Sequence, residues 1–302
     1  MRQQAVIPFL FLILLVSGCG VVSKEWIDPD TTLSSFDGPS VKGVKETVEE
    51  SAKASMNGGD YRRASQFYEQ LISAESGLAA DKLRYKVGFA ESLRRMGDND
   101  RALSIYDDLF EKNPGNLDVA EGRGLTMMAT GKVVDAGRAF ADIIAKDPKR
   151  WRTLNALGIL FVTKNMISEA MSYYTEALKY SPDNPSILNN VGLSQAVDKK
   201  YTQAIASLQQ GGRMSKSANQ RKQIEMNLAM VYGVSGDLDT AKEIAGKYLE
   251  GAALDNNLGL YAHMAKDNSL AKTYLNMALS QSPTYYERAW NNLNAIGGDN
   301  DR

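Results

Sequence analysis

The chain has 302 residues, and its 35 basic and 36 acidic side chains leave a formal net charge of −1. This balance gives no basic surplus for contacts with phosphates, so we expect no nucleic-acid partner. Cys19 is the only cysteine, which excludes a disulfide framework within the chain.

The N-terminal segment, residues 1–18, has the pattern of a secretory signal peptide. Arg2 precedes an apolar run over residues 5–16, and the small residues Ser17 and Gly18 follow that run. The run is shorter than the roughly 20 residues that a membrane-spanning helix needs. Two other interpretations stay open, which are a plain secreted protein with one free cysteine and an uncleaved anchor.

The end of this segment, Val16-Ser17-Gly18-Cys19, resembles the lipobox of bacterial lipoproteins, with Val where Leu is commoner. The resemblance implies that Cys19 becomes the first mature residue and carries acyl chains such as palmitate. Several acyl chains anchor a protein stably, whereas one chain alone binds a membrane marginally. In a diderm bacterium, Gly20 in place of Asp implies, by the rule for that family, a lipid anchor in the outer membrane with the protein on the periplasmic face.

The stretch that follows the signal peptide, residues 19–43, shows no periodic pattern. It contains Pro29 and Pro39 together with several Gly, Ser, Thr and Asp residues. This composition is typical of a flexible linker, so we expect a tether between the membrane and the rest of the chain.

A repeat of 34 residues dominates residues 44–284. Pro114, Pro148 and Pro182 stand 34 residues apart, which is a period typical of stacked helix-turn-helix repeats. In the repeat that begins at Trp151, the positions that define the pattern hold Leu154, Leu157, Gly158, Phe161, Ala170, Tyr174, Ala177 and Pro182. At each of these positions the chain resembles the tetratricopeptide repeat. In the next repeat towards the N-terminus, Arg123 departs from the pattern at position 7.

The resemblance implies an all-α fold, an α-solenoid of about seven helix-turn-helix repeats. A capping helix and a polar tail at residues 285–302 would then close the array. Small residues at positions 8 and 20, such as Gly158 and Ala170, are expected to let the two helices of a repeat approach closely. The turn between them needs left-handed backbone, which Gly59, Gly97, Gly131, Asn165 and Gly236 can adopt. The residues expected to cap the second helices are Asp60, Asp98 and Asp237.

The residues show no constellation for catalysis, and we expect no enzyme, metal site or cofactor. His263 is the single histidine, whereas zinc sites need several Cys or His ligands. No glycine-rich phosphate-binding motif follows a predicted strand. His263 is therefore interpreted as an ordinary helix residue.

In tetratricopeptide arrays the first helices line a concave groove, to which positions 2, 5, 6, 9 and 12 of each repeat contribute. Asparagine amides there can pair with the backbone of an extended peptide, and Leu or Met can add adaptable apolar contacts. The alternative is that these asparagines serve only the fold. The predicted peptide-binding groove residues are Asn155, Ile159, Asn189, Asn190, Leu193, Met226, Asn227, Met230, Asn257 and Leu260.

A basic clamp for a peptide carboxylate is not expected. Such a clamp needs Lys or Arg at positions 2, 5 and 6 of adjacent repeats. Arg84 and Arg152 meet this need at position 2, but Val87, Gly88 and Glu121 stand at other clamp positions.

The combination of lipobox, tether and repeat array resembles the assembly lipoproteins of bacterial surface machines, above all those of the tight-adherence (Flp) pilus. This resemblance implies a protein scaffold that assists assembly, with a secretin or pilus component as partner. An adaptor that regulates peptidoglycan synthases or hydrolases is the alternative.

Overall fold

The computed structural model describes residues 41–74, 79–281 and 286–298. The regular elements in these residues are all helices: α2 (Val41–Gly58), α3 (Tyr61–Ala74), α4 (Ala79–Met96), α5 (Asn99–Lys112), α6 (Leu117–Ala129), α7 (Val133–Lys146), α8 (Trp151–Thr163), α9 (Ile167–Tyr180), α10 (Pro185–Val197), α11 (Tyr201–Met214), α12 (Ala218–Val234), α13 (Leu238–Ala245), α14 (Gly251–Met264), α15 (Asn268–Gln281) and α16 (Glu287–Gly298). The predicted signal peptide and Cys19 lie outside the described residues, as does the rest of the tether up to residue 40. No helix of the described ranges is both long enough and apolar enough to cross a membrane.

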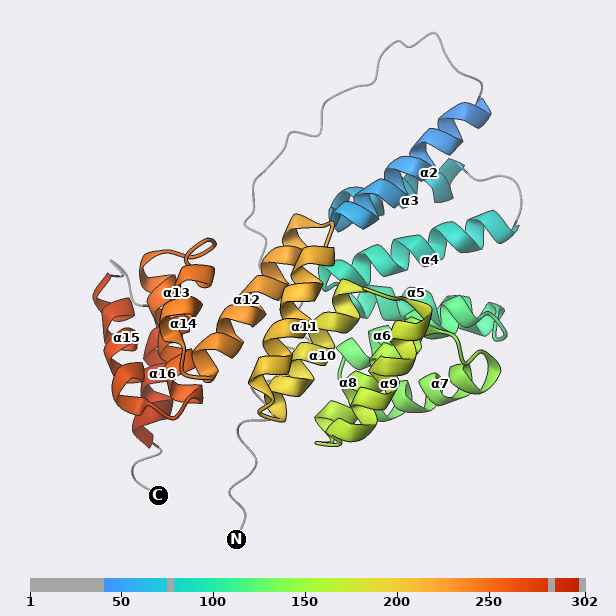
Figure 1. The fold of residues 1–302 in the computed structure, drawn as a ribbon. Coiled ribbons are helices and arrows are strands. Elements are labelled where there is room, and N and C mark those ends of the chain that lie inside the picture. The colour runs from blue at the N-terminus through green and yellow to red at the C-terminus, as the bar shows by residue number, and fades with distance from the viewer. Residues whose placement is uncertain (1–40, 75–78, 282–285, 299–302) are drawn as a thin grey trace, which may run out of the picture. The chain divides into compact units, whose positions relative to one another are not determined.

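The described helices follow one another as seven pairs, α2 with α3 through α14 with α15, and α16 comes after the last pair (Figure 1). This order confirms the predicted all-α fold of helix-turn-helix repeats. Pro114, Pro148 and Pro182 each stand two residues beyond the end of a second helix, namely α5, α7 and α9. Each proline is placed where its ring and missing amide hydrogen prevent the helix from continuing.

The chain divides into two compact units within α8, between Leu157 and Gly158. The described part of the N-terminal unit runs from α2 to the first half of α8. Its apolar core consists of small clusters shared by successive helices. Ala52, Leu71 and Tyr85 form one cluster, and a second consists of Ala90, Tyr106, Leu109 and Val119.

The C-terminal unit begins at Gly158 and includes α9 to α16. A large apolar cluster extends over α10 to α14 and includes Leu193, Leu208, Met230 and Leu258. At the end of the unit, Ala289 and Ile296 of α16 are buried against residues of α14 and α15. Helix α16 therefore covers the apolar side of the last helix pair, as expected of a capping helix.

The turns inside the repeats take left-handed backbone, as predicted. Gly59, Gly97, Gly131 and Gly236 have φ values between 78° and 101°, and φ of Asn165 is 58°. Lys199 and Lys266 fill the same slot in two later repeats, with φ values of 59° and 73°. Neither lysine was predicted there, because the left-handed region is uncommon for residues other than glycine and asparagine. The backbone bonds from Lys199 to Ala196 and from Lys200 to Gln195 satisfy carbonyls of α10 and hold its turn in place.

The predicted aspartate caps form at two of three positions. Asp60 accepts a hydrogen bond from the backbone N–H of Arg63 at 3.1 Å, and Asp237 accepts one from Thr240 at 3.0 Å. The prediction was wrong for Asp98, whose side chain caps no backbone group. Its carboxylate instead accepts from the Arg101 guanidinium at 2.9 Å.

Where glycine stands at position 8 of a repeat, it allows close contact between the paired helices. A Cβ atom added to Gly158 would lie 2.4 Å from Cε1 of Tyr174, whose ring is fully buried at position 24. The same contact joins Gly124 to Phe140 and Gly192 to Leu208. At Gly192 the backbone oxygen of the position 20 residue is also close to such a Cβ, at 3.0 Å. The predicted close approach is confirmed, and its main partner is the large residue at position 24.

One ion pair of the N-terminal unit is buried. The Glu91 carboxylate accepts from Nε of Arg94 at 2.8 Å and from a terminal nitrogen at 2.6 Å, and Arg152 of α8 approaches it at 3.4 Å. Burial by itself would raise the pKa of Glu91, but the charge and hydrogen bonds of Arg94 outweigh that effect and hold the pKa at about 2. Glu91 is therefore ionised in the fold near neutral pH.

Replacing Gly158 by alanine is expected to lower the free energy of unfolding by about 1–3 kcal/mol, because the new methyl group overlaps the buried Tyr174 ring. Urea denaturation followed by circular dichroism measures this change. Gly115→Ala is the matched control, since an added Cβ there meets no atom within 4 Å and the backbone is not left-handed. Equal stability of the two variants would contradict the proposed role of position 8.

Glu91 also predicts a dependence of stability on pH. Because its folded-state pKa lies below its ordinary value, ionised Glu91 favours folding above pH 4.5, and this contribution is lost as pH falls towards 2. Between pH 6 and pH 3 the wild type should lose about 2 kcal/mol more unfolding free energy than Glu91→Gln, which cannot titrate at this position. Urea denaturation at both pH values tests this. Parallel losses in both proteins would show that Glu91 is not the titrating group.

Candidate functional site

The predicted groove residues lie on the first helices of four successive repeats, α8, α10, α12 and α14. Asn155 belongs to the N-terminal unit, and the other nine belong to the C-terminal unit. In the C-terminal unit α12 packs against both α10 and α14, so the first helices of these three repeats are direct neighbours. This neighbourhood brings the predicted groove positions of α10, α12 and α14 onto adjoining helices.

Two of the predicted asparagines link neighbouring first helices directly. The Asn227 amide on α12 donates to the side-chain oxygen of Asn189 on α10 at 2.8 Å. The Asn189 amide in turn donates to the side-chain oxygen of Asn190 at 3.3 Å. Asn189 and Asn227 remain partly exposed, whereas Asn190 is 7% exposed. These two hydrogen bonds connect predicted groove residues to one another, and one of them joins neighbouring first helices.

The amides of α14 also bond within the fold. Asn257 donates to the carbonyl of Ala253, one turn earlier in the same helix, at 2.8 Å. The adjacent Asn256 is buried and accepts from Asn292 of α16 at 3.0 Å. These contacts favour the alternative that some of the asparagines serve the fold. Binding of a peptide by Asn257 stays a prediction.

The apolar members of the predicted groove divide by exposure. Leu193 and Met230 are 0% and 2% exposed and belong to the core of the C-terminal unit, and Ile159 is 8% exposed. Met226 and Leu260 are only partly buried. Leu193 and Met230 therefore leave almost no surface for a ligand in this conformation, and Met226 and Leu260 are the apolar groove residues that can contact one.

The groove positions of the N-terminal unit carry charged groups whose buried contacts were not predicted from the sequence. Glu91 occupies position 9 of its repeat and bonds Arg94 and Arg152, as described above. Glu121 occupies position 5 of the next repeat, is 6% exposed, and accepts from the Thr153 hydroxyl of α8 at 2.7 Å. For Glu91 the available signal was a carboxylate at position 9, which is apolar in the other repeats, as Ile159 and Leu193 show. The groove positions of the two units thus differ in chemistry, with buried carboxylates in the N-terminal unit and amides in the C-terminal unit.

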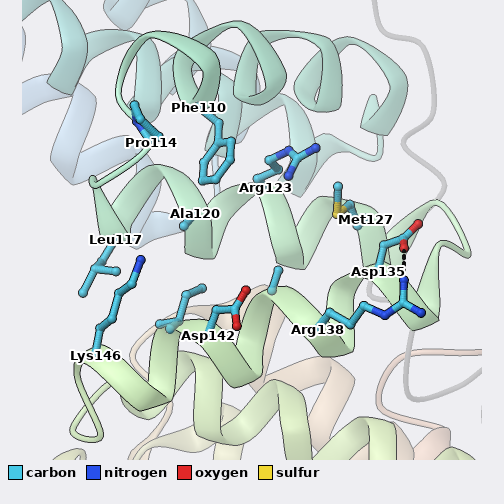
Figure 2. Close-up of a pocket in the computed structure, with 12 residues that line it drawn as sticks. Phe110, Pro114, Leu117, Ala120, Arg123, Met127, Asp135, Arg138, Asp142 and Lys146 are labelled. Carbon is cyan, nitrogen blue, oxygen red and sulfur yellow. Dashed lines mark ion pairs between the residues drawn. The ribbon is translucent and has the colours of Figure 1, made fainter.

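A pocket of about 430 Å³ lies on the N-terminal unit, among α5, α6 and α7 (Figure 2). Phe110, Leu117 and Met127 contribute apolar surface to it, and the charged residues of α7 line one side. Arg123, the departure from the repeat pattern at position 7, is part of its wall. Its side chain donates to Asp107 at 2.6 Å and lies over the Phe110 ring, with its guanidinium carbon 4.8 Å from the ring centroid.

The part of the chain that the structure describes holds no group of three or more His, Cys, Asp or Glu side chains that could bind a metal ion. Nδ1 of His263 lies 2.8 Å from the side-chain oxygen of Asn268, which begins α15. This contact places His263 at the turn between α14 and α15.

Comparison with known proteins agrees with the geometry of the repeats. Two family models described as "Tetratricopeptide repeat" match residues 93–157 and 155–213. The chain is 27% identical over 134 residues to the uncharacterized protein y4yS of Sinorhizobium fredii, a match that covers 44% of this chain and 69% of y4yS. It is 25% identical over 119 residues to the BBSome complex member BBS4 of Bos taurus, where the match covers 39% of this chain and only 23% of BBS4.

The fold is similar to a solved tetratricopeptide repeat protein from Parabacteroides merdae. The two structures have a TM-score of 0.52 at 15% identity, over 84% of this chain and 99% of that one. Helix pairs, left-handed turns, close contacts at position 8 and the two matched models all agree. Residues 93–213 are therefore tetratricopeptide repeats, within an all-α chain whose helix pairs form a scaffold for protein interaction.

Proposed function

We propose that this protein is a membrane-anchored scaffold that binds another protein of the bacterial envelope and assists assembly of a surface machine. The proposal is carried by one combination, a Val16-Ser17-Gly18-Cys19 segment and tetratricopeptide repeats in a single chain. Acyl chains on Cys19 would hold the protein in the outer membrane on its periplasmic face. The repeats would then be available to a periplasmic partner.

The proposed machine is the tight-adherence (Flp) pilus or its secretin. The plan of the chain resembles that of TadD, the tetratricopeptide lipoprotein of this system, and pilotin-like tetratricopeptide lipoproteins come next. The resemblance implies a secretin or pilus component as the bound partner. If the bound partner is instead a peptidoglycan synthase or hydrolase, the protein is an adaptor that regulates these enzymes.

The proposed contact surface is the groove of the C-terminal unit on α10, α12 and α14. Met226 and Leu260 supply partly exposed apolar area, and flexible Met side chains suit adaptable contacts. The Asn189–Asn227 pair offers amide groups beside them that can exchange hydrogen bonds with a peptide backbone. An extended peptide segment of the partner is the ligand that fits this combination.

The anchor is tested by metabolic labelling with a palmitate analogue, followed by separation of the inner and outer membranes. The wild type should carry the label and sediment with the outer membrane, because several acyl chains bind stably. Cys19→Ser should lose both properties. Absence of label from the wild type would remove the anchor and, with it, the proposed pilus role.

The groove is tested by purifying the tagged protein from envelope extracts in mild detergent and identifying co-purified proteins by mass spectrometry. We expect a secretin or pilus protein, and we expect the double variant Met226→Ser with Leu260→Ser to retain about tenfold less of it, since apolar contact area is lost. Met277→Ser is the matched control, because Met277 is 42% exposed on the second helix α15, outside the predicted groove positions. Recovery of peptidoglycan enzymes in place of pilus proteins would support the alternative function as an adaptor. Equal recovery of the partner by the wild type and the double variant would exclude this groove as the binding site.

A further inference from the structure

Helix α7 of the N-terminal unit has an unusually exposed outer face. Val134 is 68% exposed, more than any other large hydrophobic side chain in the described residues. Arg138, Ala141, Asp142 and Ala145 are exposed along the same helix. Small and apolar residues next to charged ones are typical of a helix face that can pack against another helix.

The charges on this helix alternate in sign along the rim of the pocket. Asp135, Arg138, Asp142 and Lys146 follow one another at spacings of three, four and four residues, which places them on one face of α7. Figure 2 shows them along one side of the pocket, with Asp135 and Arg138 at one end and Lys146 at the other, beside Leu117.

These four groups are weakly paired within the described chain. Arg138 and Asp135 are 3.6 Å apart, and their side chains are 77% and 59% exposed, so water screens the pair. No ion pair among the described residues includes Asp142 or Lys146. On the opposite wall, Arg123 is already bonded to Asp107. The charges of α7 are therefore available to a partner.

The order of these charges is self-complementary. In an antiparallel pair of identical α7 helices, Arg138 of each copy faces Asp142 of the other, and Asp135 faces Lys146. Both pairings share nearly the same midpoint, at Phe140 and Ala141, so one two-fold axis satisfies all four contacts at once. A two-fold interface requires this kind of self-complementarity. A partner surface whose charges all had one sign would be repelled by two of these four α7 side chains.

We propose that this face of α7 is a homodimer interface, occupied by α7 of a second copy of this chain. Ala141, close to the two-fold axis, is small and lets the helices approach. The axis brings the exposed Val134 of each copy to the Lys146 end of the other copy's pocket, where Leu117 offers apolar surface. Exposed ion pairs each contribute little, so the dimer is weak and is stabilised by low salt.

The test is sedimentation equilibrium of the full-length chain with Cys19→Ser, in density-matched mild detergent so that the apolar run at residues 5–16 does not drive association. The average mass should rise towards a dimer with concentration, and added salt should reduce it. Arg138→Glu and Asp142→Arg should each weaken association roughly tenfold, because two symmetric attractions become repulsions.

The decisive sample is an equimolar mixture of the two single variants. In the mixed dimer the introduced glutamate of one chain meets the introduced arginine of the other, and the unchanged Arg138 meets the unchanged Asp142, so association should return. Arg101→Glu is the control, since Arg101 is also an exposed arginine, on α5, and its reversal should leave association unchanged. Thermal melting confirms that each variant is folded, and Asp135→Lys with Lys146→Glu provides a second pair for the same mixing test.

A monomeric wild type at all concentrations would overturn the proposal, and the face would then be open to an unrelated partner. Association that survives either reversal, or folded variants whose mixture stays monomeric, would overturn it too. Recovery only in the mixture would support it, because pairing of positions 138 and 142 across the two-fold axis predicts that result.

Discussion

In four repeats, the contact between glycine at position 8 and a large side chain at position 24 determines how closely the two helices pack. Where Gly158 meets Tyr174, the absence of one methyl group lets a buried aromatic ring lie directly against the first helix. Close packing of this kind leaves no space for an added atom, so the distance between the two helices is fixed. A short turn is then enough to connect the two helices, because they are already in contact.

This constraint is local, and so is the core that it produces. The two apolar clusters of the N-terminal unit each connect three successive helices, and the large cluster of the C-terminal unit extends through neighbouring helices in the same way. Stability in such an arrangement is roughly the sum of neighbouring contacts. The first-helix positions that do not pack between helices can therefore vary in residue type. They carry different residue types in the two units.

In the N-terminal unit, groove positions hold Glu91 and Glu121, which buried hydrogen bonds to Arg94 and Thr153 satisfy. A buried, paired charge contributes little net stability, but removal of its partner strongly destabilises the fold. In the C-terminal unit, Asn189 and Asn227 are partly exposed and can change partners without uncovering a charge. This difference in the cost of exchanging a hydrogen bond is the reason for placing the proposed peptide contact in the C-terminal unit. The outer face of α7, in contrast, combines weakly paired charges with a pocket, which suits association between copies.

The repeat and most of its local structure could be predicted from the residue types and their spacing. Proline spacing, glycine at position 8 and the left-handed turn at Asn165 all follow from the conformations that these residue types allow. Features that depend on contacts with neighbouring elements could be seen only in the folded chain. Lys199 and Lys266 take left-handed backbone because the surrounding bonds require it, and Asp98 turns to Arg101. Leu193 and Met230 are predicted groove residues that burial places in the core, because helical spacing cannot tell which side of a first helix the next repeat covers.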